Sequence, residues 1–178
     1  MKKNVLIISS SPRRGGNSDL LCDEFDKGAE NAGHLVEKIA LRDKNIRYCN
    51  GCGVCYAGKG CPMKDDMSEI LDKMIAADVI VLASPIYFYT MCGQLKTMID
   101  RCCSRYNEIT GKEFYYILAA ADPMPDTMER AISEFQGFLY CLDDARECGT
   151  ICAVGVMDKG DVRNKRYMQE AYGMGANV

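Results

Sequence analysis

The stretch VLIISSSPRRGGNS, residues Val5 to Ser18, carries the clearest structural signal in the sequence. Residues 5–9 are a continuous apolar run ending in a turn, which is typical of a strand buried on both faces of a parallel sheet. Asn17 or Ser18 can cap a helix, and apolar residues recur at helical spacing after them. The stretch therefore predicts a strand, a loop and a helix, the repeating unit of an α/β fold.

The loop between this strand and helix is rich in hydroxyls and glycines. Free main-chain N–H groups and the positive end of the helix dipole converge at such a turn and favour an anion such as phosphate. Gly15 and Gly16 let the backbone approach a ligand, and Arg13 can neutralise its charge. The pattern is neither G-x-G-x-x-G nor the Walker lysine loop, which argues against a dinucleotide Rossmann site and an NTPase. The same residue types also make an ordinary turn, so both interpretations stay open here.

Strand and helix patterns alternate along the rest of the chain. Strands are predicted at residues 5–9, 34–41, 78–83, 114–121 and 150–156. Helices are predicted at about residues 17–32, 66–75, 95–102, 126–142 and 162–172, the last ended by Gly173. This alternation predicts a five-stranded parallel sheet with helices on both faces, because right-handed crossovers lay each helix on the sheet. No linker or repeat is visible, so residues 1–178 are expected to form a single domain.

In a parallel sheet, every loop that leaves the carboxyl end of a strand emerges on the same edge. The loops expected to share this edge are residues 10–18, 42–65, 84–92 and 121–126. The 42–65 segment is longer than the ~12–15 residues beyond which structureless loops become uncommon, which indicates a specific task.

Composition excludes several classes of protein. The 178 residues are 48% hydrophobic and 26% charged, as in globular domains, with a net charge of −3. This balance argues against nucleic-acid binding, because the one basic cluster, residues 163–166, is interpreted as a solvated helix face. The apolar run at residues 5–8 is too short for a signal sequence, and no segment approaches the ~18 apolar residues of a membrane span. A cytoplasmic protein without membrane contact is expected, in which the 11 cysteines stay reduced.

Four cysteines lie in the 42–65 segment with the spacing C-x2-C-x2-C-x5-C: Cys49, Cys52, Cys55 and Cys61. The spacing of the first three cysteines, and the proline after the last cysteine, are those of bacterial ferredoxins, although five residues replace three before the last cysteine. The spacing favours an iron-sulfur cluster over zinc, whose four-cysteine sites usually pair two C-x2-C knuckles. Empty thiols remain an alternative. The cysteines in helix or strand patterns are expected to be buried: Cys22, Cys102, Cys141 and Cys152.

Several motifs together resemble the flavodoxin-like NAD(P)H-dependent FMN reductases. They are S-x-S-P-R-x-x-G-N-S after the first strand, S-P-I-Y-F after the third, and L-K-T-M-I-D-R at residues 95–101. With the cysteine segment and C-P-M-K-D-D-M at residues 61–67, the resemblance narrows to the iron-sulfur flavoproteins. It implies a flavodoxin-like three-layer sandwich with strand order 2-1-3-4-5, in which FMN binds where strands one and three part.

Carried over to this sequence, the resemblance implies two cofactor sites. The FMN phosphate is expected on Ser9, Ser11, Arg13, Asn17 and Ser18. The flavin ring is expected against Pro85, Ile86, Tyr87 and Phe88, with Ala120 and Asp122 on its far side. A [4Fe-4S] cluster is expected on Cys49, Cys52, Cys55 and Cys61.

The function implied by the resemblance is that of an FMN-dependent oxidoreductase with NAD(P)H as the electron donor. Electrons would pass from reduced FMN through the cluster to a small-molecule or protein acceptor, in a homodimer or homotetramer. Strand order motivates the further hypothesis that transfer between cluster and flavin crosses a subunit interface. The alternatives are a non-enzymatic electron-transfer flavoprotein, an FMN-only quinone-type reductase with an empty cysteine segment, and a zinc-stapled binding module.

Overall fold

The computed structural model describes residues 1–178, except for the side chain of Pro125. The strands are β1 (Asn4–Ser9), β2 (Leu35–Ala40), β3 (Val79–Tyr87), β4 (Thr90–Met91), β5 (Glu113–Ala119) and β6 (Arg146–Ala153). The α-helices are α1 (Asn17–Asn31), α2 (Met67–Ala76), α3 (Gly93–Arg101), α4 (Glu129–Leu139) and α5 (Tyr167–Ala176). Within the part of the chain so described, no helix is both long and apolar enough to cross a membrane.

The central sheet has the strand order β2-β1-β3-β5-β6, and all neighbours in this series are parallel. It confirms the predicted order 2-1-3-4-5, with β5 and β6 as the fourth and fifth parallel strands. The two-residue strand β4, which pairs antiparallel with the end of β3, was not predicted. A strand of this length is too short to produce a periodic pattern in the sequence.

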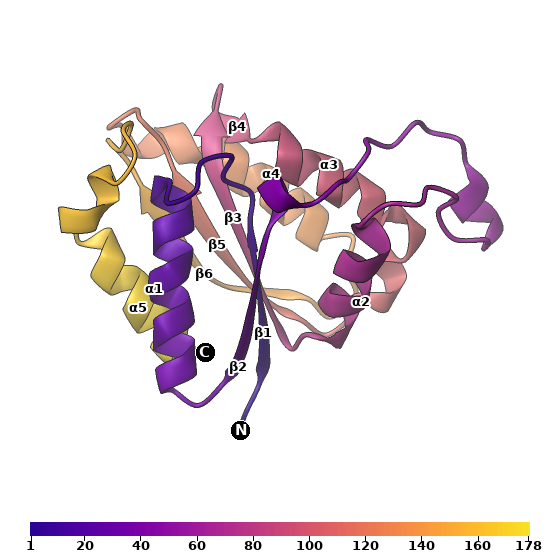
Figure 1. Cartoon of the computed structure of the whole chain (residues 1–178), viewed down its shortest axis with the longest axis horizontal. Coiled ribbons are helices and arrows are strands. Elements are labelled where there is room, and N and C mark those ends of the chain that lie inside the picture. The colour runs from indigo at the N-terminus through magenta and orange to yellow at the C-terminus, as the bar shows by residue number, and fades with distance from the viewer.

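Two hydrophobic cores lie on the two faces of the sheet (Figure 1). Along β1, Val5 and Ile7 pack on the side of α1 and α5, whereas Leu6 and Ile8 pack on the side of α2, α3 and α4. This alternation follows from the two-residue period of a strand and explains why β1 is apolar throughout. The predicted three-layer sandwich is confirmed.

The last helix begins later and ends later than predicted. Residues 161–164 form a separate 3-10 turn, so the basic cluster at residues 163–166 is exposed but precedes α5 rather than forming one of its faces. The helix continues through Gly173 to Ala176. The last strand also differs, since β6 begins at Arg146 and ends at Ala153; its first residues are exposed at the sheet edge and lack an apolar pattern.

Helices α1 and α5 touch each other through their backbones. A Cβ atom on Gly28 would lie 2.1 Å from the carbonyl oxygen of Tyr172, and one on Gly175 would lie 2.0 Å from that of Phe25. Real Cβ atoms do not approach backbone atoms so closely, so the contact requires glycine on both helices. The requirement for close packing explains why Gly175 lies inside α5 instead of ending it.

This contact predicts opposite effects for two neighbouring substitutions. Gly175→Ala should lower the free energy of unfolding by about 1–3 kcal/mol, because the added methyl group has no room. Gly173→Ala is the matched control: nothing lies within 4 Å of its added Cβ. It should be neutral or stabilising by up to about 1 kcal/mol, as alanine favours helix interiors. Urea unfolding measures both, and equal midpoints would show that the helices can separate without cost.

Candidate functional site

The carboxyl ends of β1 and β3 lie side by side at one edge of the sheet, with Ser9 in register with Ala83. Beyond this point the two connections part. The chain after β1 turns to α1 on one face, whereas the chain after β3 forms a hairpin with β4 and enters α3 on the other face (Figure 1). Diverging connections of this kind leave a crevice at the edge of a parallel sheet, the usual place for a ligand.

A cavity of about 250 Å³ occupies this crevice. Its lining residues come from the β1–α1 loop, the end of β3, the segment after β5 and the segment after β6. They are Ser11, Arg13, Gly16, Asn17, Ser18, Pro85, Ile86, Tyr87, Ala119, Ala121, Val156 and Met157. The hydroxyls and Arg13 lie at the N-terminus of α1, and the remaining lining is mainly apolar, so the cavity has a polar end and an apolar slot.

The polar end fits a phosphate group. The hydroxyl of Ser18 is buried and has no hydrogen-bond partner within the described part of the chain. The first turn of α1 also has N–H groups without helical carbonyl partners. A Cβ atom on Gly16 would lie 2.6 Å from Ser11 Oγ, so this position admits only glycine without displacing the loop. Unpaired donors, a helix N-terminus and Arg13 together are what an anion requires.

The buried carboxylate of Asp19, which the sequence analysis did not single out, fixes this loop from beneath. It accepts hydrogen bonds from Ser9 Oγ (2.8 Å) and the N–H of Gly15 (2.9 Å). It also pairs with Lys38 (2.8 Å) and Arg42 (3.3 Å). Burial acts to raise the pKa of Asp19, but the bonds from Lys38, Gly15 and Ser9 outweigh it and lower the pKa to about 2. The carboxylate is therefore ionised at neutral pH and holds the turn.

Several residues predicted to bind the flavin do not line this cavity. Ser9 is buried and its hydroxyl donates to Asp19. Phe88 is 98% exposed at the tip of the β3–β4 hairpin. Ala120 packs into the core on the side of α2, α3 and α4. Asp122 lines a separate cavity beside Tyr89 and Arg130.

The neighbours of Ala120 line the cavity, whereas Ala120 and Asp122 do not. Ala119 and Ala121 line the cavity because neighbouring residues of an extended chain point to opposite faces. Val156 and Met157 form a wall that no motif in the sequence indicated. The only available signal was their position at the end of the strand predicted at residues 150–156, at the carboxyl edge of the sheet.

The hairpin beside the cavity has an unusual backbone. Phe88 and Tyr89 have φ values of 50° and 66°, although side chains other than glycine, asparagine and aspartate rarely adopt positive φ. Two successive residues with positive φ are typical of the tight turn that best matches the twist of a hairpin. The strained turn presents two aromatic side chains next to the cavity, with Phe88 fully in solvent and Tyr89 half exposed.

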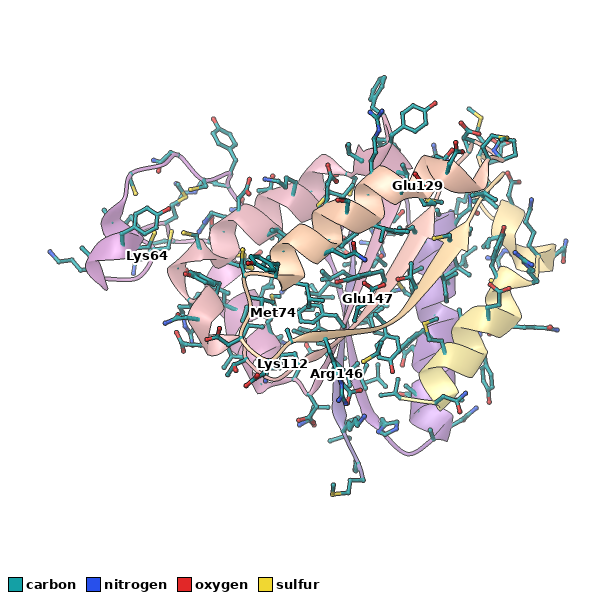
Figure 2. The ribbon with its side chains drawn as sticks, turned by 180° about the vertical axis from the view of Figure 1, so that it is seen from behind. Lys64, Met74, Lys112, Glu129, Arg146 and Glu147 are labelled. Carbon is teal, nitrogen blue, oxygen red and sulfur yellow. The ribbon has the colours of Figure 1, made fainter. Side chains whose placement is uncertain are left out.

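The cysteine segment does not stay at the carboxyl edge, contrary to the expectation for residues 42–65. It extends beyond α2 and α3, away from the β1–α1 loop (Figure 1), and Figure 2 shows it, with Lys64 labelled, at the periphery of the molecule. A wide cavity of about 690 Å³ lies between this segment and the ends of α3 and α4, lined in part by Cys49, Tyr56 and Cys103. None of its lining residues belongs to the cavity at the β1–β3 crevice.

The four thiols of the motif do not converge in this structure. Cys49 and Cys52 are exposed, and Cys55 and Cys61 are half-buried. Among the described side chains, no group of three or more histidine, cysteine or acidic residues is gathered closely enough to hold a metal ion. The segment thus supplies the thiols that an iron-sulfur cluster needs, but the described side chains do not form an assembled cluster site. Of the cysteines expected to be buried, Cys141 is exposed, because it follows the end of α4.

A buried ion pair holds both ends of the cysteine segment against α3. Arg101 donates two hydrogen bonds to Asp65, at 2.7 and 3.0 Å, and one to the carbonyl oxygen of Arg47 at 2.6 Å. It also approaches Cys61 Sγ at 3.4 Å. The hydrogen bonds from Arg101, helped by the N–H groups of Arg47 and Met67, outweigh burial and lower the pKa of Asp65 to about 2.

The low pKa of Asp65 predicts a loss of stability in acid. The folded-state pKa lies below the ordinary value of 3.8, so the stabilisation is complete above about pH 4 and is lost as pH falls towards 2. Asp65→Asn should weaken the fall of the free energy of unfolding in acid, leaving the part due to Asp19. At pH 7 it should lower the free energy of unfolding by about 3–5 kcal/mol, because Arg101 is left unpaired. Asp100→Asn breaks only the exposed pair with Lys96 and should cost less than about 1 kcal/mol. If both variants lost the same free energy of unfolding at pH 7, the result would contradict a stabilising role for the Arg101–Asp65 ion pair.

Comparisons with known proteins agree with the fold. The chain is 43% identical over 94 residues to an iron-sulfur flavoprotein of Archaeoglobus fulgidus, covering 53% of this chain and 43% of that protein. It is 44% identical over 97 residues to an iron-sulfur flavoprotein of Methanocaldococcus jannaschii, covering 54% of this chain and 50% of that protein. The matched region thus spans about half the length of these relatives.

Among solved structures, the NAD(P)H:quinone oxidoreductase from Methanothermobacter marburgensis superposes with a TM-score of 0.78 at 19% identity. The match covers 99% of this chain and 96% of that one. At this identity the likeness shows the flavodoxin-like fold alone. The family comparison is more specific, because the model for the NADPH-dependent FMN reductases matches residues 3–131, more than half of the chain. The chain belongs to the NADPH-dependent FMN reductase family.

Proposed function

We propose that the protein is an FMN-dependent oxidoreductase that takes electrons from a nicotinamide nucleotide. The observation that carries this proposal is the unpaired, buried hydroxyl of Ser18 at the N-terminus of α1, at the polar end of an otherwise mainly apolar cavity. FMN has the matching shape: a phosphate on a flexible chain and a flat, largely apolar ring. Family membership supports the same cofactor.

The residues of the cavity divide the work of binding. Arg13 and Ser18, with the N–H groups of the first turn of α1, would hold the phosphate. Ser11 donates its hydroxyl to the carbonyl oxygen of Arg13 at 3.1 Å and would have to turn that hydroxyl to join them. The end of β3 (Pro85–Tyr87) and the Val156–Met157 wall would hold the ring and exclude water from it. FMN, when bound, supplies hydride and single-electron chemistry. Among the described residues that line the cavity, Arg13 and Tyr87 alone are ionisable, so this lining offers no carboxylate or imidazole.

A second candidate is an electron-transfer flavoprotein that works between protein partners without a nicotinamide donor. The exposed aromatic side chains of the β3–β4 hairpin favour it, because they lie beside the cavity and are free to contact a protein. Steady-state oxidation of NADH and NADPH by the FMN-loaded protein distinguishes the candidates. Turnover with either nucleotide supports the reductase, and its absence in a protein that binds FMN supports the carrier.

The loop geometry predicts which glycine FMN binding requires. Gly16→Ala should weaken FMN binding at least about tenfold, because its methyl group displaces the hydroxyl of Ser11 or the turn itself. Gly137→Ala in α4 is the control, since nothing lies within 4 Å of its added Cβ, and it should bind FMN as the wild type does. Quenching of flavin fluorescence measures both affinities. Unchanged binding by the Gly16 variant would contradict a phosphate site in this loop.

We extend the proposal to a [4Fe-4S] cluster on Cys49, Cys52, Cys55 and Cys61. The ferredoxin-like spacing and the names of the relatives support it, and the guanidinium of Arg101 beside Cys61 suits an anionic group. The thiols would have to converge when the cluster binds. A cluster carries single electrons, which would suit a one-electron acceptor.

The cluster proposal predicts about four iron atoms and four acid-labile sulfides per chain after anaerobic purification. Cys55→Ser should lose most of the iron, whereas Cys148→Ser, which changes an exposed thiol in β6 that does not line the cavity beside the cysteine segment, should keep it. Metal and sulfide analysis measures this. One zinc per chain, or no metal at all, would contradict the cluster and leave the FMN proposal standing.

The assembly and location of the protein are part of the same proposal. The cysteine segment and the FMN cavity share no lining residue, and the segment extends away from the body of the subunit. This separation supports a homodimer or homotetramer in which a neighbouring subunit brings a cysteine segment to each flavin. A cytoplasmic location is proposed from the sequence alone. A variant that is monomeric but keeps full transfer between cluster and flavin would contradict the arrangement.

A further inference from the structure

The side chain of Asn17 is fully occupied by one segment of the chain, residues 156–162. Its amide nitrogen donates two hydrogen bonds and its amide oxygen accepts two. The partners are the carbonyl oxygens of Val156 (3.2 Å) and Asp158 (3.0 Å) and the N–H groups of Gly160 (3.2 Å) and Val162 (3.3 Å). An asparagine amide has two N–H donors and two lone pairs on oxygen, so no capacity remains for a phosphate.

These four bonds also fix the orientation of the amide. Turning it by 180° would set its NH₂ group against the two main-chain N–H groups and its oxygen against the two carbonyls. The side chain is about nine-tenths buried, which makes such mismatches costly. The contact therefore holds two parts of the chain, more than 130 residues apart, in one defined geometry.

The 156–162 segment depends on side chains for its shape, because it leaves the sheet after β6 and is irregular until its 3-10 turn. Arg13 Nη1 donates to the carbonyl oxygen of Met157 at 3.0 Å. The carboxylate of Asp161 accepts hydrogen bonds from the N–H groups of Met157 (3.0 Å) and Asp158 (2.8 Å). The segment is thus tied to the β1–α1 loop by Asn17 and Arg13, and Val156 and Met157 form one wall of the cavity.

We propose that Asn17 is a positioning residue, which builds the ring side of the flavin site by holding the 156–162 segment and contacts the phosphate only through its main chain. The proposal rests on the proposed function, since the cavity must hold FMN for the wall to matter. It differs from the expectation that the Asn17 side chain binds phosphate. A residue that binds the phosphate contributes to the affinity for FMN but not for riboflavin, which lacks the phosphate. A residue that positions the wall beside the ring contributes to both affinities equally.

Asn17→Ala tests the proposal with two measurements. In the flavin-free protein, exchange of the amide hydrogens of Gly160 and Val162 should accelerate at least about tenfold, because their acceptor is gone. The affinities for FMN and riboflavin, measured by flavin fluorescence, should fall by the same factor, at least about fivefold. Asp161→Ala loosens the same segment from an exposed position without touching α1. It should lower both affinities equally and provides the test if the Asn17 variant does not fold.

Ser18→Ala is the matched control, because its hydroxyl lines the same cavity without a partner. Ser18→Ala should lower the affinity for FMN, but the affinity for riboflavin and the amide exchange rates of Gly160 and Val162 should stay unchanged. The proposal is overturned if Asn17→Ala behaves like Ser18→Ala, or if exchange of the 156–162 segment stays at the wild-type rate. Wild-type protein that binds neither flavin would instead refute the proposed function, and the exchange rates alone would then decide whether Asn17 holds the segment.

Discussion

Parallel pairing of β1 between β2 and β3 is the constraint on which the rest of the structure depends. It places the ends of β1 and β3 in register, while the connections that follow go to opposite faces of the sheet. The crevice between them needs no side chain to create it, because it follows from the order of the strands. In the proposed function, the polar end of this crevice, at the N-terminus of α1, takes a phosphate, and its apolar slot takes a flat ring.

Two buried carboxylates hold the two loops to which the proposed function assigns cofactors. Asp19 bonds to the β1–α1 loop from inside the protein and is neutralised by Lys38 and Arg42. Asp65 does the same for the cysteine segment through Arg101. In both places the paired charge is removed from solvent, so losing one partner leaves a costly unpaired ion. The loops are therefore shaped mainly by the protein, with donors and thiols left over for ligands.

The parts of the fold and site that follow from local patterns could be predicted from the sequence. The apolar run of β1 and the alternation of elements predicted the parallel sheet, and the hydroxyl-rich loop predicted the polar end of the cavity. The order of the strands came from the family resemblance. Long-range contacts could not be predicted in this way. The bonds of Asn17 to residues 156–162 and the backbone contact at Gly175 join distant segments that carry no shared pattern. The cysteine segment was misplaced for the same reason, since its anchor on Arg101 is a tertiary contact.

A crystal structure of the protein with FMN tests the central claim most directly, because it locates the phosphate and the ring separately. The account predicts the phosphate within hydrogen-bond distance of Ser18 Oγ and of main-chain N–H groups in the first turn of α1, with the ring between Pro85–Tyr87 and the Val156–Met157 wall. A phosphate bound elsewhere, or a flavin seated in the cavity beneath the cysteine segment, would contradict it.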